Sequence, residues 1–213
     1  FGGGDEAPTS DLDNEEFTTF ELGVKSKLPR GNVQLSTYYT YIQDRIFRLN
    51  DPVTKRNIDN GYIQGVELAG DFFLNDNWTL FGDIAWQEGR EDAYIDRSLD
   101  AGTEDRPMSR MQPLTFRAGA RFDDDASRFW FETFVVHGDG QDRLTDGEKS
   151  DNRFPPAGTP SYTTLNAACG YRLTESAELA VRLENLTDEE YRIHGSGVNE
   201  PGRNLILTFL YHF

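Results

Sequence analysis

Apolar and polar side chains alternate along nine segments of the chain, and this period of two constrains the fold more than any other feature. In one such segment, Trp78, Ile84 and Trp86 share one parity, and Asp83 has the other. Such alternation is typical of a β-strand with one apolar and one polar face. Prolines fall between the segments or at their starts. The sequence therefore predicts strands at about 17–28, 32–48, 59–74, 78–88, 113–123, 128–138, 161–173, 177–186 and 203–213.

The connections between these predicted strands alternate in length. Short turns at 29–31, 75–77, 124–127 and 174–176 alternate with long polar links at 49–58, 89–112, 139–160 and 187–202. In an up-and-down sheet all short turns then lie at one end, which is the asymmetry of outer-membrane barrels. The predicted fold is all-β, a transmembrane antiparallel up-and-down β-barrel segment of about nine strands. We expect the short turns to face the periplasm and the long links to face outside.

The composition excludes two other classes of protein. The 213-residue chain carries 37 Asp and Glu against 21 Lys and Arg, a formal net charge of −16, so it lacks the basic surface that binds nucleic acid. No run approaches the roughly 18 uninterrupted apolar residues of a membrane helix. A β-barrel remains compatible with this polar composition, because its strands alternate apolar and polar residues.

Charges on the predicted strands fall on the polar parity, and a buried sandwich core could not accept so many of them. We therefore expect a water-filled lumen on that side, with Arg117, Arg121, Arg182 and Glu184 as lumen-facing candidates. Trp78 and Trp86 lie on the opposite, lipid-facing parity, eight residues apart. That spacing is about 26 Å along a strand and about 20 Å along the membrane normal at a tilt of about 40°. The two indoles are thus expected to form an interface girdle.

The last predicted strand ends on an aromatic residue. Its apolar parity consists of Leu205, Leu207, Phe209, Tyr211 and Phe213. This pattern resembles the C-terminal signal that the β-barrel assembly machinery of outer membranes recognises. The resemblance implies that these five residues form an assembly signal and that the machinery is a partner.

Several motifs resemble one family. Asn185-Leu186-Thr187-Asp188, together with the later Pro201-Gly202-Arg203, resembles the closing signature of TonB-dependent outer-membrane receptors. Upstream, Gly65-Val66-Glu67 is similar to the family's recurrent Gly-Val-Glu strand, and Glu21-Leu22-Gly23-Val24-Lys25 to its Glu-Leu-Gly-x-Lys strand. The resemblance covers about residues 17–213.

The resemblance implies a location and partners. The family builds barrels of about 22 strands around a plug domain, so we interpret 17–213 as the C-terminal transmembrane part of a larger barrel, and 1–16 as an acidic, glycine-rich loop or linker. Implied partners are the remaining barrel and plug, in the same or a separate chain, TonB through the plug portion, and outer-membrane lipid with lipopolysaccharide. The implied location is the outer membrane of a Gram-negative bacterium, with the C-terminus periplasmic.

Three functional classes follow. The first is a receptor wall for uptake of a scarce nutrient such as a siderophore or other metal chelate. The alternative is a plug-less split or truncated barrel that acts as a structural or interaction scaffold. A barrel enzyme ranks last, because His137, His194 and His212 lie on separate segments without a nucleophile or ligand set. No catalytic residue, cofactor or metal ligand is predicted, and the acidic residues of 139–151 are interpreted as a solvated loop.

Overall fold

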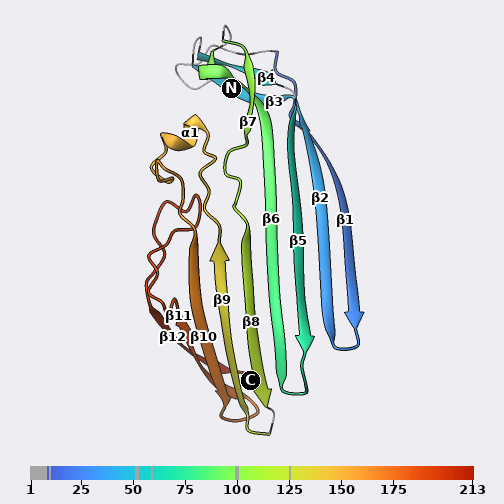
Figure 1. The fold of residues 1–213 in the computed structure, drawn as a ribbon, viewed down its shortest axis with the longest axis vertical. Helices are drawn as coiled ribbons and strands as arrows, with labels where there is room; N and C mark the ends of the chain where they lie inside the picture. Colours follow the sequence, from blue (N-terminus) through green and yellow to red (C-terminus); the bar gives the residue numbers. More distant parts are fainter. Residues whose placement is uncertain (1–8, 10, 51–52, 59, 99–100, 125) are drawn as a thin grey trace.

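The computed structural model describes residues 9, 11–50, 53–58, 60–98, 101–124 and 126–213. Its dominant feature is one curved sheet (Figure 1). The strands follow one another across it in the order β1 (Glu16–Leu28), β2 (Gly31–Gln43), β5 (Gly61–Phe73), β6 (Trp78–Tyr94), β8 (Thr115–Asp124), β9 (Phe129–Gly138), β10 (Tyr162–Arg172), β11 (Ala177–Glu184) and β12 (Asn204–Tyr211).

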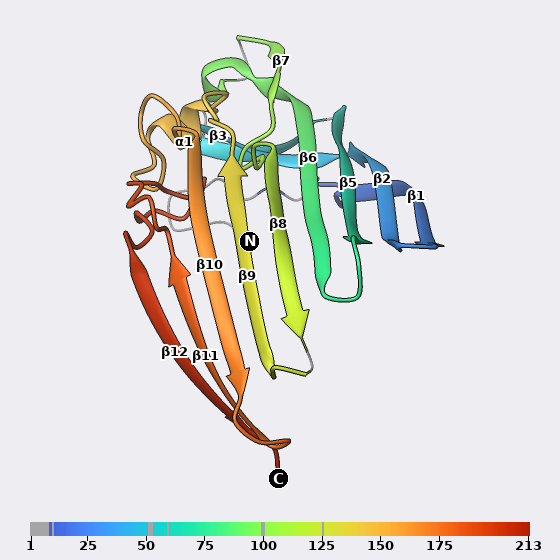
Figure 2. The same cartoon turned by 60° about the horizontal axis from the view of Figure 1, so that its bottom comes forward.

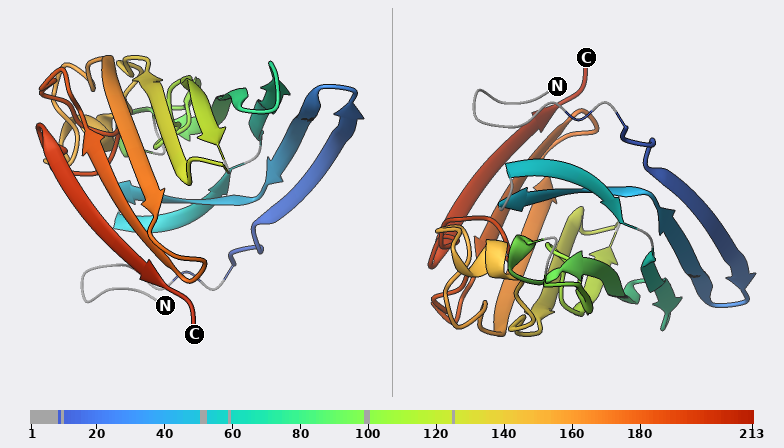
Figure 3. Two further views of the ribbon diagram at one scale, coloured as in Figure 1. Left: turned by 90° about the horizontal axis from the view of Figure 1, so that it is seen from below. Right: turned by 90° about the horizontal axis from the view of Figure 1, so that it is seen from above.

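The order in the sheet follows the order in the chain, and every pairing is antiparallel. The sheet is therefore the up-and-down meander that the sequence predicts, and the expected nine strands are confirmed. Short turns gather at one end, here called the turn end, and long connections at the other, here called the loop end (Figure 2). Viewed along its strands, the sheet is an arc with β1 and β12 at its two edges (Figure 3).

The register keeps the two faces of the meander separate across the whole sheet. On β6, Ile84 pairs with Leu68 of β5 and with Phe116 of β8, so apolar residues meet apolar residues. The next charged position, Asp83, pairs with Arg117. Because side chains alternate strictly along a strand, this register continues each face from strand to strand. The parity assigned from sequence is therefore the parity of the folded sheet.

Glycine fixes the first turn of the sheet. Gly31 opens β2 with φ of 153°, and a side chain there would overlap the Asp71 carbonyl group of β5. Only a residue without Cβ allows this close approach of β2 to β5.

The structure departs from the sequence prediction at the loop end. We expected one strand over 32–48, but β2 ends at Gln43, and Asp44 has a left-handed φ of 52°. A separate hairpin follows, β3 (Arg45–Asn50) with β4 (Val53–Ile58). The alternation continues across Asp44, so periodicity alone does not reveal the change of direction. Similarly, β6 extends to Tyr94, and β7 (Thr103–Pro107) pairs with that extension inside a predicted loop.

A small core holds these additions together. Phe47 and Leu49 of the hairpin are buried with Ala93 of β6, and Ile58 and Tyr94 pack against them. Figure 3 shows the β3–β4 hairpin crossing the concave side of the sheet. Ala93, which packs against the hairpin, lies on the same face of β6 as Asp83. The hairpin therefore lies over the face of β6 that carries the charged residues.

The helices of the described chain are short, η1 (Ile95–Arg97) and α1 (Asp146–Lys149), and neither could span a membrane. Of the predicted linker 1–16, residues 1–8 and 10 lie outside the described residues. Of the remainder, the Asp13 backbone N–H donates to Asn57 at 2.9 Å, and Glu15 accepts from the Ile46 backbone N–H at 2.9 Å. This part of the predicted linker is thus bonded to the β3–β4 hairpin.

Candidate functional site: the charged face and the loop end

One face of the main sheet carries its charges, and we call it the charged face. Its members are Glu21, Lys25, Glu67, Asp71, Asp83, Arg117, Arg121, Glu132, Arg172, Arg182 and Glu184, which the register places on one side. All four lumen-facing candidates predicted from sequence belong to it. That this face lines a lumen stays a prediction.

The charged residues pair along and across strands. Arg117 lies 2.8 Å from Asp83, and Arg121 lies 3.5 Å from Glu132. Within β11, Arg182 lies 3.6 Å from Glu184. These side chains are partly solvent-exposed, so each pair contributes only about 0–1 kcal/mol to stability. A function that needs a polar surface therefore accounts for the charges better than stability does.

Aromatic side chains of the charged face lie over glycines of the neighbouring strand. Tyr38 covers Gly65 and donates to Gln87 at 3.2 Å. Trp130 covers Gly170, and its Nε1–H donates to Glu178 at 2.9 Å. Each contact ties three strands together, because the glycine leaves room for the ring. The sequence reasoning missed these pairs, since only the register shows which glycine faces which ring.

A cavity of about 590 Å³ opens on the charged face near the turn end. Five strands contribute to its lining, which includes Lys25, Gln34, Asp71, Phe81 and Arg117. Both signs of charge are present, and the Arg117 guanidinium also stacks 5.4 Å from the Phe81 ring centre. The surface is suited to contact a polar partner of mixed charge.

The opposite face is apolar and exposed. Leu207 and Phe209 of β12 are 68% and 62% exposed, and Leu80 and Ile84 of β6 show the same character. Such a continuous apolar surface exceeds what a water-soluble monomer normally shows. Members named from sequence as outward-facing are Leu80, Ile84, Phe116, Ala118, Leu179, Val181, Leu207 and Phe209, and all of them share this face.

Trp78 and Trp86 lie on the apolar face at different heights. Trp78 begins β6 at the turn end and contacts Phe122, with ring centres 5.3 Å apart. Trp86 pairs with Val66 closer to the loop end. Both indoles are 37% exposed. Their contact with two membrane interfaces stays a prediction.

The predicted assembly signal lies at one edge of the sheet. Leu205, Leu207, Phe209 and Tyr211 alternate along β12 on the apolar face, opposite Leu183, Val181, Leu179 and Ala177 of β11. Phe213 follows the strand and contacts Tyr211 edge to face, with ring centres 5.3 Å apart. Recognition of these residues by an assembly machinery stays a prediction.

At the loop end, a buried carboxylate binds two arginines. Glu91 of β6 is 2% exposed. It accepts from Arg106 of β7 at 3.0 and 3.2 Å and forms a second ion pair with Arg45 of β3. Burial lowers the pKa of both guanidinium groups, and Arg106 also lowers that of Arg45 by repulsion. The Arg106 guanidinium stacks 5.0 Å from the Phe47 ring centre.

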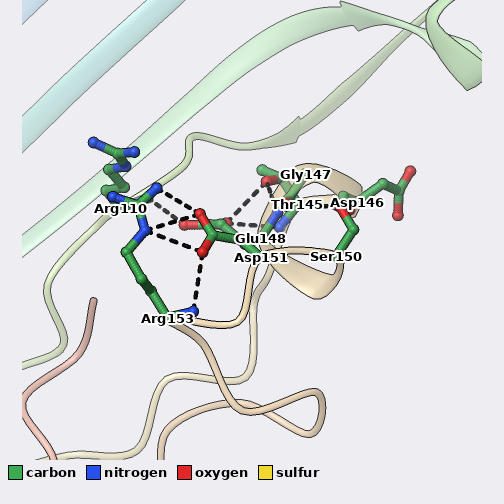
Figure 4. A network of polar contacts seen from close by, with 8 residues as sticks. All are labelled: Arg110, Thr145, Asp146, Gly147, Glu148, Ser150, Asp151 and Arg153. Carbon is green, nitrogen blue, oxygen red and sulfur yellow. Dashed lines mark hydrogen bonds and ion pairs between the residues drawn. The ribbon is translucent and has the colours of Figure 1, made fainter. Parts of the chain in front are cut away.

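The segment around α1 forms a second polar network (Figure 4). Glu148 accepts from the Thr145 backbone N–H at 2.8 Å and from the Arg110 backbone N–H at 2.6 Å. Together with the bond from the Glu148 backbone to Thr145, this makes a capping box. Nearby, Arg153 donates to Asp151 and lowers the pKa of that carboxyl to about 2.

His194 is buried and packs against neighbouring loop residues, as a structural histidine does. It is 5% exposed, its Nδ1 lies 2.9 Å from the Thr159 hydroxyl, and its ring lies 4.9 Å from that of Phe154. Burial lowers its pKa. Elsewhere, His137 lies 3.0 Å from Asp139. Within the part of the chain that the structure describes, no group of three or more His, Cys, Asp or Glu residues is arranged to hold a metal ion.

These features define a class of protein. A curved up-and-down meander with an exposed apolar convex face and a charged concave face is the wall of a transmembrane β-barrel. Long connections at one end and short turns at the other fit the same class.

Comparison with known proteins gives the family. The chain matches the family model described as TonB dependent receptor-like, beta-barrel, over residues 1–186. The chain therefore belongs to the TonB-dependent receptor family, which confirms the resemblance seen in the sequence. This is a family of outer-membrane receptors and transporters of Gram-negative bacteria rather than of enzymes.

Individual relatives agree with this family assignment. The vitamin B12 transporter BtuB of Vibrio vulnificus (strain YJ016) is 29% identical over 214 residues, covering 95% of this chain and 30% of the relative. The copper transporter OprC superposes with a TM-score of 0.76 at 21% identity, over 96% of this chain and 32% of that one. The ferric-catecholate import receptor Fiu of K12 E. coli superposes with a TM-score of 0.72 at 20% identity, over 100% of this chain and 30% of that one. The two structural matches show the fold, and the chain spans about a third of these proteins.

Proposed function

We propose that this chain forms part of the wall of a TonB-dependent receptor that takes up a scarce nutrient, such as a siderophore or other metal chelate. The observation that carries the proposal is the strict separation of a charged concave face from an apolar convex face in a chain of this family. An aqueous path and a lipid contact each require one of these faces. The cargoes in the names of the relatives, which are vitamin B12, copper and ferric catecholate, all fit this class of nutrient.

The proposed orientation follows from the two ends of the sheet. The turn end and Phe213 face the periplasm, and the loop end faces outside. Residues 17–213 supply the strands of the barrel wall and their loops, with Arg117, Arg121, Arg182 and Glu184 toward the lumen. The apolar face contacts lipid and lipopolysaccharide, with Trp78 and Trp86 as the interface girdle. The β-barrel assembly machinery inserts the wall by reading the end of β12.

The edges of the sheet support a larger barrel. Within the described residues, β1 pairs only with β2, and β12 only with β11. An unpaired strand edge in lipid costs several kcal/mol for each unsatisfied backbone group. Because nine alternating strands end in the direction in which they begin, joining β1 to β12 would make a parallel seam. Further antiparallel strands, about 22 in all by family resemblance, and a plug that couples to TonB complete the proposed receptor.

Uptake in cells tests this function. Cells with the intact receptor, cells lacking it and cells lacking TonB are given labelled vitamin B12, copper, and iron chelated by a catecholate, a hydroxamate or citrate. We expect receptor-dependent accumulation of at least one of these, lost without TonB. The scaffold alternative predicts normal membrane insertion with no receptor-dependent accumulation of any of them, and that result would overturn the proposal.

A further inference from the structure

A second cavity, of about 310 Å³, lies at the loop end and has an unusual charge. Its lining includes five arginines, which are Arg45, Arg48, Arg97, Arg106 and Arg110, and three carboxylates, which are Glu91, Glu148 and Asp151. Its volume is near the lower limit of the range of about 300–1,000 Å³ that is typical of small-molecule sites. The chain as a whole has a net charge of −16, so a cavity lined by more arginines than carboxylates differs in sign from the rest of the molecule.

The three carboxylates are already occupied by groups of the protein. Glu91 accepts from Arg106 and pairs with Arg45. Glu148 is bonded to the backbone N–H groups of Thr145 and Arg110, and Asp151 is held by Arg153, whose own charge adds to the excess. Arginines therefore outnumber carboxylates in the lining itself, and Glu15, Glu104 and Asp146 act on Arg45 and Arg106 from outside it.

Two arginines supply the excess positive charge of the lining. In the described chain, the guanidinium groups of Arg97 and Arg110 form no hydrogen bond or ion pair, and Figure 4 shows the Arg110 group directed away from the carboxylates around α1. The Arg110 charge still acts at longer range on Asp151, whose pKa it helps to lower. Both residues have left-handed backbones, with φ of 53° and 63°. Such a backbone costs a residue other than glycine about 1–2 kcal/mol. The fold thus accepts local strain at both positions.

We propose that this cavity binds a soluble anionic ligand through carboxylate or phosphate oxygens. Arg97 and Arg110 bind the oxygens, since a guanidinium presents two parallel N–H donors that match a carboxylate or phosphate. Arg45 and Arg106, which are held by Glu91, line the same cavity. The ligand has the size of a small polycarboxylate or the anionic arm of a chelate.

The position of the cavity favours a soluble ligand over a lipid headgroup. Glu91 has the parity of the charged face, and the β3–β4 hairpin that supplies Arg45 and Arg48 crosses the concave side of the sheet (Figure 3). Lipopolysaccharide would instead lie along the convex apolar face. The inference deepens the proposed function by naming the charge of the ligand, and it rests on that function only for access from outside.

Binding to the purified receptor tests the inference independently of transport. Calorimetry on the complete receptor in detergent, with citrate and then inorganic phosphate as probes, is expected to show binding that weakens with added salt. Substituting Arg97→Gln and Arg110→Gln together is expected to weaken citrate binding by at least about tenfold, because two charge-assisted contacts are lost. Neither substitution leaves a carboxylate without its partner, so folding should be kept, and heat-modifiable gel mobility checks this.

The matched control removes the same charge elsewhere at the loop end. Arg143→Gln with Arg203→Gln changes two exposed arginines that pair with Glu88 and Asp188 and do not line the cavity. This control should keep citrate binding within about twofold. The inference is overturned if neither probe binds, if the control and the cavity variant lose binding equally, or if lipopolysaccharide micelles alone bind in an arginine-dependent manner. Loss of uptake with binding retained would count against the transport proposal alone.

Discussion

Replacing neighbouring residues on β6 by arginine gives the sharpest test of the two faces. Ile84 pairs with Leu68 and Phe116 on the apolar face, whereas Ala85 pairs with Glu67 and Thr115 on the charged face. The substitution is the same and the positions are adjacent. Any difference in stability therefore reports which face contacts lipid.

The magnitude follows from depth and from the neighbours. Ile84 is two residues from Trp86, which is about 7 Å along the strand and about 5 Å along the normal. Arginine facing lipid costs about 2–4 kcal/mol at the midplane and about 0–1 kcal/mol at an interface. We expect Ile84→Arg to cost about 2 kcal/mol, or about 30-fold in the folding equilibrium. Ala85→Arg gains Glu67 as a cross-strand partner, worth about 0.2–1 kcal/mol.

The assay is refolding of the complete receptor into lipid vesicles across a urea series, with folded fraction read from heat-modifiable gel mobility. Val181→Arg, halfway along β11, should lose about 2–4 kcal/mol in the same experiment. Conversely, Arg182→Gln should leave insertion intact. If Ala85→Arg were destabilised and Ile84→Arg were tolerated, the charged face would be the lipid face and the reasoning would be wrong.

Three further results are expected. Protease added to intact cells should cut within 89–112 or 139–160 and spare 123–127, and cleavage confined to the short turns would reverse the proposed orientation. Phe213→Ala should reduce assembly without changing ligand affinity, because the aromatic end is the proposed assembly signal; normal insertion of a protein lacking these last residues would refute this. Burial holds the pKa of His194 below its usual 6.5, so the unfolded loop end takes up a proton first and its stability should fall as pH drops below 6.5 toward the folded pKa. Hydrogen exchange around 154–159, corrected for its intrinsic pH dependence, should show this loss in the wild type and not in His194→Asn.

At the loop end, the sequence did not predict where β2 ends and a new hairpin begins. Nothing in the alternation of 32–48 marks Asp44 as the residue where the strand leaves the sheet. The chain leaves the main sheet there because a left-handed backbone and the burial of Phe47 and Leu49 against Ala93 stabilise a separate hairpin. Burial of this kind depends on β6, which follows the hairpin in the chain, and a local pattern cannot report it.

The nine strands of the meander, their antiparallel order and the two faces were determined by the sequence itself, because a period of two is a local property and each short turn fixes the next register; β3, β4 and β7 were not. Arg117 and Asp83 could be assigned to one face without knowing that they pair. The arginine cavity was decided only by the tertiary structure. Its lining comes from β3, the end of β6, β7 and the segment around α1, which are far apart in the chain. Only the folding of the hairpin across the concave face brings their charges together.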